Sequence, residues 1–369
     1  MRLSLVDRYI LREVAQVWVA VTAVLILILA SNSLVHLLGK VVEGELSGEA
    51  VLPLFLIRLT AYFVTLIPLG LFLALLLGFG RLYAESEMAA LGACGVGLAR
   101  LFRPVLLLGV FGAALTAGLT LYASPWAERA SDQIAARVAA QSDFTGLAPG
   151  RFNRAGNGAV LFAESRGDDG ALEEVFVVLD RGGDRTRIVR AGRAVQRIDD
   201  ASGRRFLEFR EGQRTAISAG SPRVRKIDFD RHGIYLPRKE IETGGPGPEG
   251  MSMRQLLARG GSEHLAEFQW RLSLPIACFL LALAALPLSH TTPRKGRYGK
   301  VAIGLLLYLG YSNLLVFGQE LLQEGTVPPA VGMWWTHAVV VVAIAALIVQ
   351  RTGWQWTRAV LLPGRESRG

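Results

Sequence analysis

The stretch GRLYAESEMAALGACGVGLARLFRPV, residues 80–105, lies between two long apolar runs and decides how the chain is organised. It carries two carboxylates, Glu85 and Glu87, followed by a patch of small residues. Acidic residues are favourable at the start of a helix, and glycines such as Gly95 and Gly97 interrupt one. The pattern therefore predicts a short helix that begins at Glu87, in a loop between two membrane spans.

The apolar runs on either side of this stretch are long enough to cross a membrane, which takes about 20 residues of helix. The chain has 369 residues, of which 51% are hydrophobic and 19% charged, a balance that indicates membrane helices combined with a soluble part. The first run is too long for the core of a cleavable signal peptide. Six spans are expected, at residues 14–38, 53–79, 104–124, 272–289, 301–319 and 331–350.

Basic residues set the expected orientation, because cytoplasmic loops carry an excess of Arg and Lys. In a six-span chain the basic N-terminal segment, the stretch at 80–105, the loop SHTTPRKGRYGK and the basic C-terminal tail all fall on one side. The short loops on the other side lean acidic. We therefore expect both termini in the cytoplasm. The net charge of +9 then reflects membrane topology, and no basic-aromatic patch favours binding to nucleic acid.

The segment 125–266 has a different periodicity and lies outside the cytoplasm in this topology. Ser124 and Pro125 suit the N-cap and first residue of a new helix. Alternating apolar and polar runs follow, separated by Asp-Gly, Gly-Gly and Ser-Gly pairs, and this favours an antiparallel sandwich or jelly roll. The expected domains are residues 1–124 with three spans, 125–266 with an all-β jelly-roll-like fold, and 267–369 with three spans and a tail.

No group of residues predicts catalysis, a bound cofactor or a metal site. A nucleotide-binding P-loop needs an upstream glycine and a Ser or Thr after its Gly-Lys pair, and neither Gly39-Lys40 nor Gly299-Lys300 has them. The spans contain almost none of the carboxylates that couple transport to protons or sodium. The two cysteines are not expected to pair, and no Cys/His cluster has metal-ligand spacing. Active transport by this chain would need an outside source of energy.

Several interpretations remain open on composition. The 80–105 stretch is either a solvated loop or a short helix whose small-residue face docks into a groove on a partner. Gly304, Gly310 and Gly318 allow close helix packing, either within the chain or against a partner. Two other classes of protein share the outline: a mechanotransmission permease of the MacB/FtsX kind, which usually has four spans, and a membrane scaffold that binds periplasmic proteins without transport.

Four segments resemble the lipopolysaccharide export permease family LptF/LptG. They occur in order and cover essentially the whole chain: YILREV at 9–14, GRLYAESEMAALGACG at 80–95, EFQWRLSLP at 267–275 and LPLSHTTPRKGR at 286–297. The ESE form at 85–87 is more similar to LptF members than to LptG members. The resemblance implies a six-span permease of the bacterial inner membrane with a periplasmic jelly-roll domain.

The resemblance also implies partners and roles. The partners would be an LptG-like permease, a dimer of an LptB-like ATPase that holds ATP and Mg, and an LptC-like bitopic protein. Together they would extract lipopolysaccharide and pass it to a periplasmic bridge, with no catalysis by this chain. Residues 84–97 would form the coupling helix. Its ATPase-coupling residues would be Glu85, Glu87, Met88, Leu91 and Gly92.

The implied cargo has acyl chains that need an apolar cavity and phosphates that need cations near the outer leaflet. Members of the family place basic residues at the outer end of the first span. Here Ser33 and His36 take positions that are often basic, and Lys40 and Arg58 are the candidates to compensate. We expect these four residues to be the substrate-binding set, with the remaining charge supplied by the partner permease.

Overall fold

The computed structural model describes residues 4–42, 46, 48–141, 150, 152–155, 159–167, 170–180, 185–198, 205–218, 224–235, 247–290 and 297–352. The chain forms two compact units. The helical unit comprises Met1–Val35, Leu52–Asp132 and Pro246–Gly369, and the β unit comprises His36–Val51 and Gln133–Gly245.

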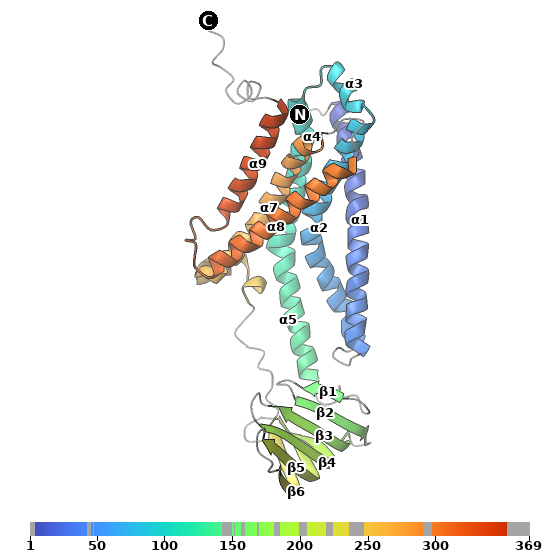
Figure 1. Ribbon diagram of the computed structural model, residues 1–369, viewed down its shortest axis with the longest axis vertical. Helices are drawn as coiled ribbons and strands as arrows, with labels where there is room; N and C mark the ends of the chain where they lie inside the picture. The colour runs from blue at the N-terminus through green and yellow to red at the C-terminus, as the bar shows by residue number, and fades with distance from the viewer. Residues whose placement is uncertain are drawn as a thin grey trace. The chain divides into compact units, whose positions relative to one another are not determined.

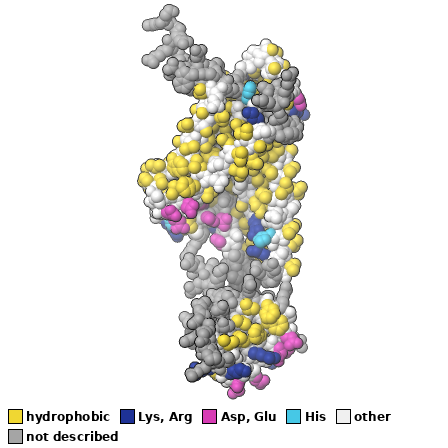
Figure 2. Space-filling model, in the orientation of Figure 1, with side chains coloured by type: hydrophobic (Ala, Val, Ile, Leu, Met, Phe, Trp, Pro, Cys, Tyr) yellow, Lys and Arg dark blue, Asp and Glu magenta, His cyan; other side chains and the backbone are white. Residues whose placement is uncertain are grey.

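Long apolar helices dominate the chain (Figure 1). Its helices are α1 Leu5–Val42, α2 Gly48–Ala84, α3 Glu87–Ala93, α4 Leu98–Gly118, the π-helix Leu119–Ala123, α5 Ser124–Gln141, the 3-10 turn Pro248–Gly250, α6 Met253–Arg259, α7 Ser262–Leu288, α8 Arg297–Gln323 and α9 Trp334–Thr352. Hydrophobic side chains cover most of the visible face of the helical unit, as expected for a surface in contact with lipid (Figure 2).

Five helices in the described residues are long and apolar enough to cross a membrane. They are Leu5–Val42, Gly48–Ala84, Ala99–Ile134, Ser262–Leu288 and Gly299–Gln323. The run expected at 331–350 is also an apolar helix, Trp334–Gln350, but it is shorter. The prediction of a multi-span membrane protein is therefore confirmed, whereas the count of six spans is not confirmed.

α5 begins at Ser124, but Ser124 is not the N-cap of a separate helix, contrary to the prediction. Ser124 has φ −62° and ψ −51°, which are helical values, and α4 continues through the π-helix Leu119–Ala123 into α5. Proline lacks the amide hydrogen that a helix interior requires. In the π-helix the regular i to i−4 pattern is already interrupted, so Pro125 follows a place where the helix tolerates it.

The core of the helical unit is built around α2 and α7. Phe72 and Phe79 of α2 and Leu281 of α7 are among its largest fully buried side chains. Gly112 of α4 lies where three helices meet, since a Cβ at this position would contact α1, α2 and α7 side chains. By contrast, α1 and α8 leave most of their apolar surface exposed, including Val35 at 69% and Leu306 at 69%.

Two of the three glycines singled out in α8 permit close packing within the chain. A Cβ on Gly304 would meet Leu76 and Phe72 of α2, and one on Gly318 would meet Thr336 of α9 at 3.0 Å. Gly310 has nothing within 4 Å of such a Cβ. Core packing therefore explains Gly304 and Gly318, while the packing within this chain leaves Gly310 unexplained.

The β unit contains one antiparallel sheet whose strands follow one another in sequence order (Figure 1). The strands are β1 Phe152–Ala155, β2 Ala159–Arg166, β3 Leu172–Asp180, β4 Arg185–Ile198, β5 Arg205–Ser218 and β6 Val224–Tyr235. A jelly roll has Greek-key connections between two sheets. The described strands form a meander instead, so the antiparallel β domain is confirmed but the jelly-roll topology is not.

A crease crosses this sheet from β2 to β6. In each of four neighbouring strand pairs, the pairing is interrupted at the same row, while the register is identical on both sides. Glu174 and Glu211 in this row have positive φ angles of 47° and 52°. The row consists of Glu164, Glu174, Gly192, Glu211 and Asp230.

The crease reverses the alternation of side chains in β3 and β4. Leu172 and Val175 are three residues apart, so a regular strand would direct them to opposite faces, yet both belong to one apolar cluster. Ala191 and Ala194 of β4 show the same shift. Because β3 and β4 shift at the same row, their apolar residues on both sides of the crease belong to one cluster.

Candidate functional site

The helix α3 begins at Glu87, where the sequence places a short helix. Ser86 precedes it with φ 62° and ψ 9°, a left-handed conformation that separates α2 from α3. Gly95, with φ 78°, follows α3 and redirects the chain toward α4. Met88 is buried in the core of the helical unit and Leu91 packs against that core. These two apolar anchors fix which side of α3 faces inward.

The opposite side of α3 is exposed among the residues that the structure describes. Ala89, Ala90, Gly92 and Ala93 are exposed, and a Cβ on Gly92 would meet nothing within 4 Å. This surface has little side-chain bulk, so a partner backbone can approach it closely. The predicted set thus divides into Met88 and Leu91, which face the core, and Gly92, which does not.

The two carboxylates of the motif gather around one guanidinium at the end of α2. Arg81 contacts Glu13 of α1 at 2.9 Å, Glu85 at 3.7 Å and Glu87 at 3.9 Å. The hydroxyl of Tyr9 donates a hydrogen bond to Glu87 Oε2 at 2.7 Å and accepts one from Arg81 Nη2 at 3.3 Å. Three helices meet in this cluster, and one cation serves three carboxylates within it.

The start of α1 is fixed by a capping box and a second ion pair. The amide of Ser4 donates to Asp7 Oδ2 at 3.0 Å, and the amide of Asp7 donates to Ser4 Oγ at 3.3 Å. Such reciprocal bonds satisfy backbone groups that a helix start leaves free. Arg103 of α4 lies 3.6 Å from the buried carboxylate of Asp7. The first turns of α1 are therefore bound to both α2 and α4.

The four predicted substrate-binding residues are in α1 and α2. Ser33 is 2% exposed and its hydroxyl oxygen has no hydrogen-bond partner among the described residues. Arg58 is partly exposed. Within the β unit, His36 is exposed and Lys40 is partly exposed. The role of these residues in binding phosphates stays a prediction.

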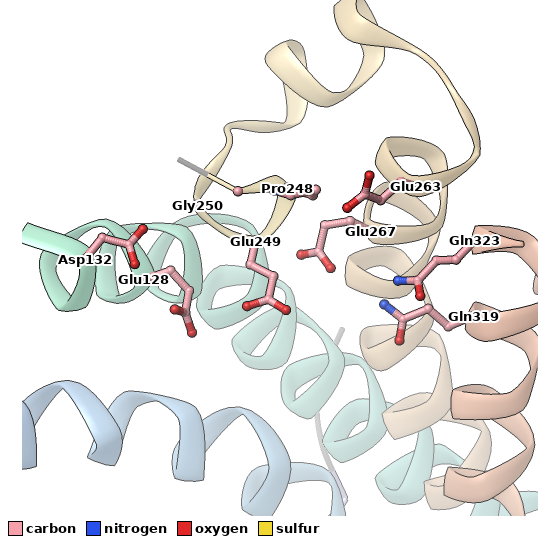
Figure 3. A pocket seen from close by; sticks show the side chains of 10 residues that line it. Glu128, Asp132, Pro248, Glu249, Gly250, Glu263, Glu267, Gln319 and Gln323 are labelled. Atoms are coloured by element: carbon pink, nitrogen blue, oxygen red, sulfur yellow. The ribbon is translucent and has the colours of Figure 1, made fainter. Parts of the chain in front are cut away.

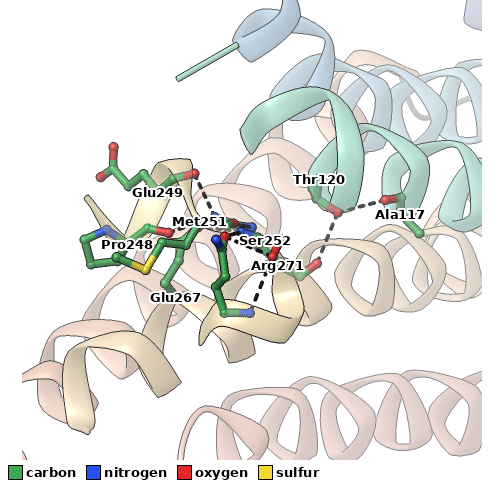
Figure 4. Close-up of polar contacts among 9 residues, drawn as sticks. Ala117, Thr120, Pro248, Glu249, Met251, Ser252, Glu267 and Arg271 are labelled. Atoms are coloured by element: carbon green, nitrogen blue, oxygen red, sulfur yellow. Dashed lines mark hydrogen bonds and ion pairs between the residues drawn. The ribbon is translucent and has the colours of Figure 1, made fainter. Parts of the chain in front are cut away.

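Arg271 of α7 holds the segment by which the chain returns to the membrane (Figure 4). It pairs with Glu267 at 2.6 Å. It also donates to three backbone carbonyls, of Met251 at 2.7 Å, Pro248 at 3.0 Å and Glu249 at 2.7 Å. Its side chain is only 3% exposed, so it needs hydrogen-bond partners in place of bulk water, and these protein groups supply them.

Two other polar residues of α7, Gln269 and Ser273, contact α9 and the turn before it. Gln269 donates to the carbonyl of Pro329 at 2.8 Å and accepts from the amide of Met333 at 2.8 Å, which holds the turn between α8 and α9. Ser273, four residues on, contacts His337 Nε2 at 3.1 Å. The other ring nitrogen of His337 contacts the hydroxyl of Tyr311. This buried chain joins α7, α8 and α9.

An acidic cavity of about 200 Å³ lies within the helical unit, where α5, α7 and α8 approach the 3-10 turn (Figure 3). Its carboxylates are Glu128, Asp132, Glu249, Glu263 and Glu267. Glu267 is already paired with Arg271. Among the residues that the structure describes, no group of three His, Cys, Asp or Glu is arranged to hold a metal ion.

Tyr9, Glu13 and Arg271 were not predicted from the sequence as members of these clusters. The spacing of Glu267 and Arg271 is a signal for an ion pair on one helix face, because residues four apart are neighbours there. No such local signal exists for Tyr9, which is separated from Glu87 by 78 positions. Only the packing of α1 beside α2 brings them together.

The fold and the site define a class: a multi-span membrane protein with an antiparallel β domain, whose short segment between two spans exposes a face of small residues. The chain belongs to the family described as lipopolysaccharide export system permease LptF/LptG, which it matches over residues 8–350.

Individual relatives support the same assignment. The chain is 30% identical over 340 residues to the lipopolysaccharide export system permease protein LptF of Escherichia coli K12, which covers 91% of this chain and 92% of the relative. The LptF proteins of Escherichia coli O157:H7 and Shigella flexneri match equally well. All of these relatives are LptF proteins, in agreement with the ESE form at 85–87, which is more similar to LptF members. The family is one of permeases, not of catalytic subunits.

Proposed function

We propose that this chain is the LptF-type permease subunit of an ABC exporter that extracts lipopolysaccharide from the bacterial inner membrane and passes it toward a periplasmic bridge. The observation that carries the proposal is the match to the permease family over residues 8–350. The described residues supply what such a subunit needs: helices that cross a membrane, a creased β-sheet with a buried apolar cluster, and a short exposed helix between two spans.

The proposed topology has six spans, with α9 as the sixth, although α9 is shorter than the others. Both termini lie in the cytoplasm and the β unit lies in the periplasm, because this arrangement places the basic loops inside. In the periplasm the creased sheet curls into a jelly-roll-like fold around its buried apolar cluster.

The energy comes from a separate ATPase. The chain forms a heterodimer with an LptG-like permease, and a dimer of an LptB-like ATPase binds ATP and Mg. The ATPase contacts α3, whose exposed face has little side-chain bulk. Closure of the ATPase dimer moves α3 and squeezes the cavity between the two permeases. An LptC-like bitopic protein receives the cargo. Ser33, His36, Lys40 and Arg58 contribute to phosphate contacts, together with cations of the partner permease.

Co-purification in mild detergent, with mass spectrometry of the bound proteins and lipid, tests this function. We expect an ATPase, a second permease and lipopolysaccharide to accompany the chain. Glu87→Lys is expected to reduce the bound ATPase, because a second cation beside Arg81 breaks the polar cluster that positions α3. Glu324→Lys, which makes the same charge reversal at an exposed acid beyond α8, serves as the matched control and is expected to leave the complex intact.

Recovery of the chain with periplasmic proteins but without an ATPase would contradict the proposal and favour a non-transporting scaffold. Full assembly and transport by Glu87→Lys would contradict the part of the proposal that places ATPase coupling at α3.

A further inference from the structure

The contacts around Tyr9 form a closed ring through three helices. Its hydroxyl donates to Glu87 of α3 at 2.7 Å and accepts from Arg81 of α2 at 3.3 Å. Arg81 also forms an ion pair with Glu13 of α1 at 2.9 Å, and its guanidinium lies 3.9 Å from the carboxylate of Glu87. A tyrosine hydroxyl has one hydrogen to donate, and here that hydrogen is directed to the carboxylate of the short helix.

This ring of contacts positions α3 and adds little to stability. Ion pairs between partly exposed side chains contribute little to stability, and the Arg81 and Glu87 side chains are 34% and 33% exposed. However, α3 has only seven residues, and a helix of this length does not hold its position alone. Its position therefore depends on its anchors. Met88 and Leu91 are the apolar anchors of α3. The polar ring is its direct contact with α1.

The packing of α1 allows it to move when α3 is displaced. Only its first turns and a few positions such as Val14 and Trp18 are buried, and 11% of its most apolar window is buried within the chain. When α1 is displaced, repacking is therefore confined mainly to these first turns, because most of its remaining apolar surface is exposed. The α2 helix, by contrast, is held by the core on most sides.

We propose that Tyr9, Arg81 and Glu87 form a latch, the Tyr9 latch, that transmits the displacement of α3 to α1. Tyr9 is a positioning residue in this role: it fixes Glu87 relative to α1, and the ATPase contacts the other side of α3. The inference rests on the proposed function, since it assigns the route by which the motion of the ATPase enters the membrane. Loss of the Tyr9 hydroxyl leaves ATPase docking intact and weakens the coupling of hydrolysis to extraction.

The test uses the full complex of this chain with its partner permease and ATPase in proteoliposomes that contain lipopolysaccharide. Tyr9→Phe removes one hydroxyl and is compared with Tyr122→Phe, which changes a tyrosine that is 77% exposed. We expect Tyr9→Phe to retain bound ATPase and to hydrolyse ATP within about twofold of the unmodified complex, while lipopolysaccharide released per ATP falls by about fivefold. Tyr122→Phe is expected to match the unmodified complex in all three.

A distance measurement reports on the latch directly. Nitroxide labels on the exposed Cys94, beyond the end of α3, and on Arg12→Cys of α1 are placed in a Cys278→Ala background. The label-to-label distance distribution is expected to broaden in Tyr9→Phe. If Tyr9→Phe fails to assemble, the same measurement on the chain alone decides: a broadened distribution supports the latch and an unchanged one overturns it.

Native release per ATP by Tyr9→Phe would overturn the latch while leaving the proposed function in place. Absence of ATP-dependent release by the unmodified complex would instead contradict the proposed function. The two failures are therefore distinguishable in one experiment.

Discussion

The guanidinium of Arg271 contacts one carboxylate and three carbonyl oxygens, and the backbone carbonyl of the same residue accepts a hydrogen bond from Thr120 at 3.2 Å. A single side chain thus joins α7 to the 3-10 turn, which follows the β unit in the sequence. Its backbone in turn contacts the π-helix. Removal of this side chain leaves several buried polar groups without partners.

Arg271→Leu is expected to destabilise the helical unit by about 3 kcal/mol or more, because it leaves the carboxylate of Glu267 buried and unpaired. Thermal unfolding in detergent measures the loss. The double variant Arg271→Leu with Glu267→Leu is expected to regain part of the stability, since the unpaired charge is gone. Unfolding of Arg271→Leu at the native temperature would show that the contacts do not hold this segment.

Glu208 of β5 gives the β unit a dependence on pH. The hydrogen bond from Arg210 lowers the pKa of Glu208, and the charges of Arg197, Arg210 and Arg231 lower it further. A carboxyl whose pKa is lower in the folded state stabilises the fold above its unfolded pKa, about 4.3 for Glu. This contribution is lost as the pH falls through the folded value.

The unfolding temperature of the β unit is therefore expected to fall below about pH 4.3, and to fall less steeply in Glu208→Gln. Calorimetry of the full chain from acid to neutral pH measures both curves. Parallel curves for the two proteins would show that Glu208 does not contribute to the acid sensitivity.

At the scale of elements, the glycines of α8 separate internal packing from an open surface. Gly304→Ala is expected to cost about 1–2 kcal/mol, because the new methyl group meets Leu76 and Phe72 in a filled core. Gly310→Ala is the matched control, since the space around it is open within the chain. It is expected to be neutral or to stabilise the helix by up to about 1 kcal/mol. Unfolding of the isolated chain compares the two variants, and equal losses would contradict the assignment.

The helices were predictable because length and apolar composition act locally. Each expected span overlaps an apolar helix, and the short helix begins at Glu87. The continuity of α4 into α5 was not predicted, because Ser124 and Pro125 give a start signal that a π-helix overrides. The crease of the sheet was not predicted either. Its strands β3 and β4 shift their alternation at the same row, and that coincidence exists only after the strands have paired.

The candidate site divides in the same way. The acids and small residues of α3 were apparent in one short stretch, and the structure shows which of them face the core. The partners of the acids come from elsewhere, because Tyr9 and Glu13 reach Arg81 only through the packing of α1 beside α2. Contacts between residues about 70 positions apart have no local pattern in one sequence.

At the scale of the whole molecule, the chain has the features of one subunit of a larger complex. The sequence lacks a P-loop, and a short helix with an exposed face lies between two spans. The apolar surfaces of α1 and α8 are exposed along most of their length, as expected for helices that face lipid or a partner permease. The family assignment agrees with a permease subunit.

The most direct test of this account is ATP-driven release of lipopolysaccharide from proteoliposomes that hold the chain with its partner permease, ATPase and receiving protein. The account predicts that release requires both this chain and ATP, and that a non-hydrolysable ATP analogue does not support it. Release that proceeds equally without ATP, or hydrolysis of ATP by the assembled complex without any release, would contradict it.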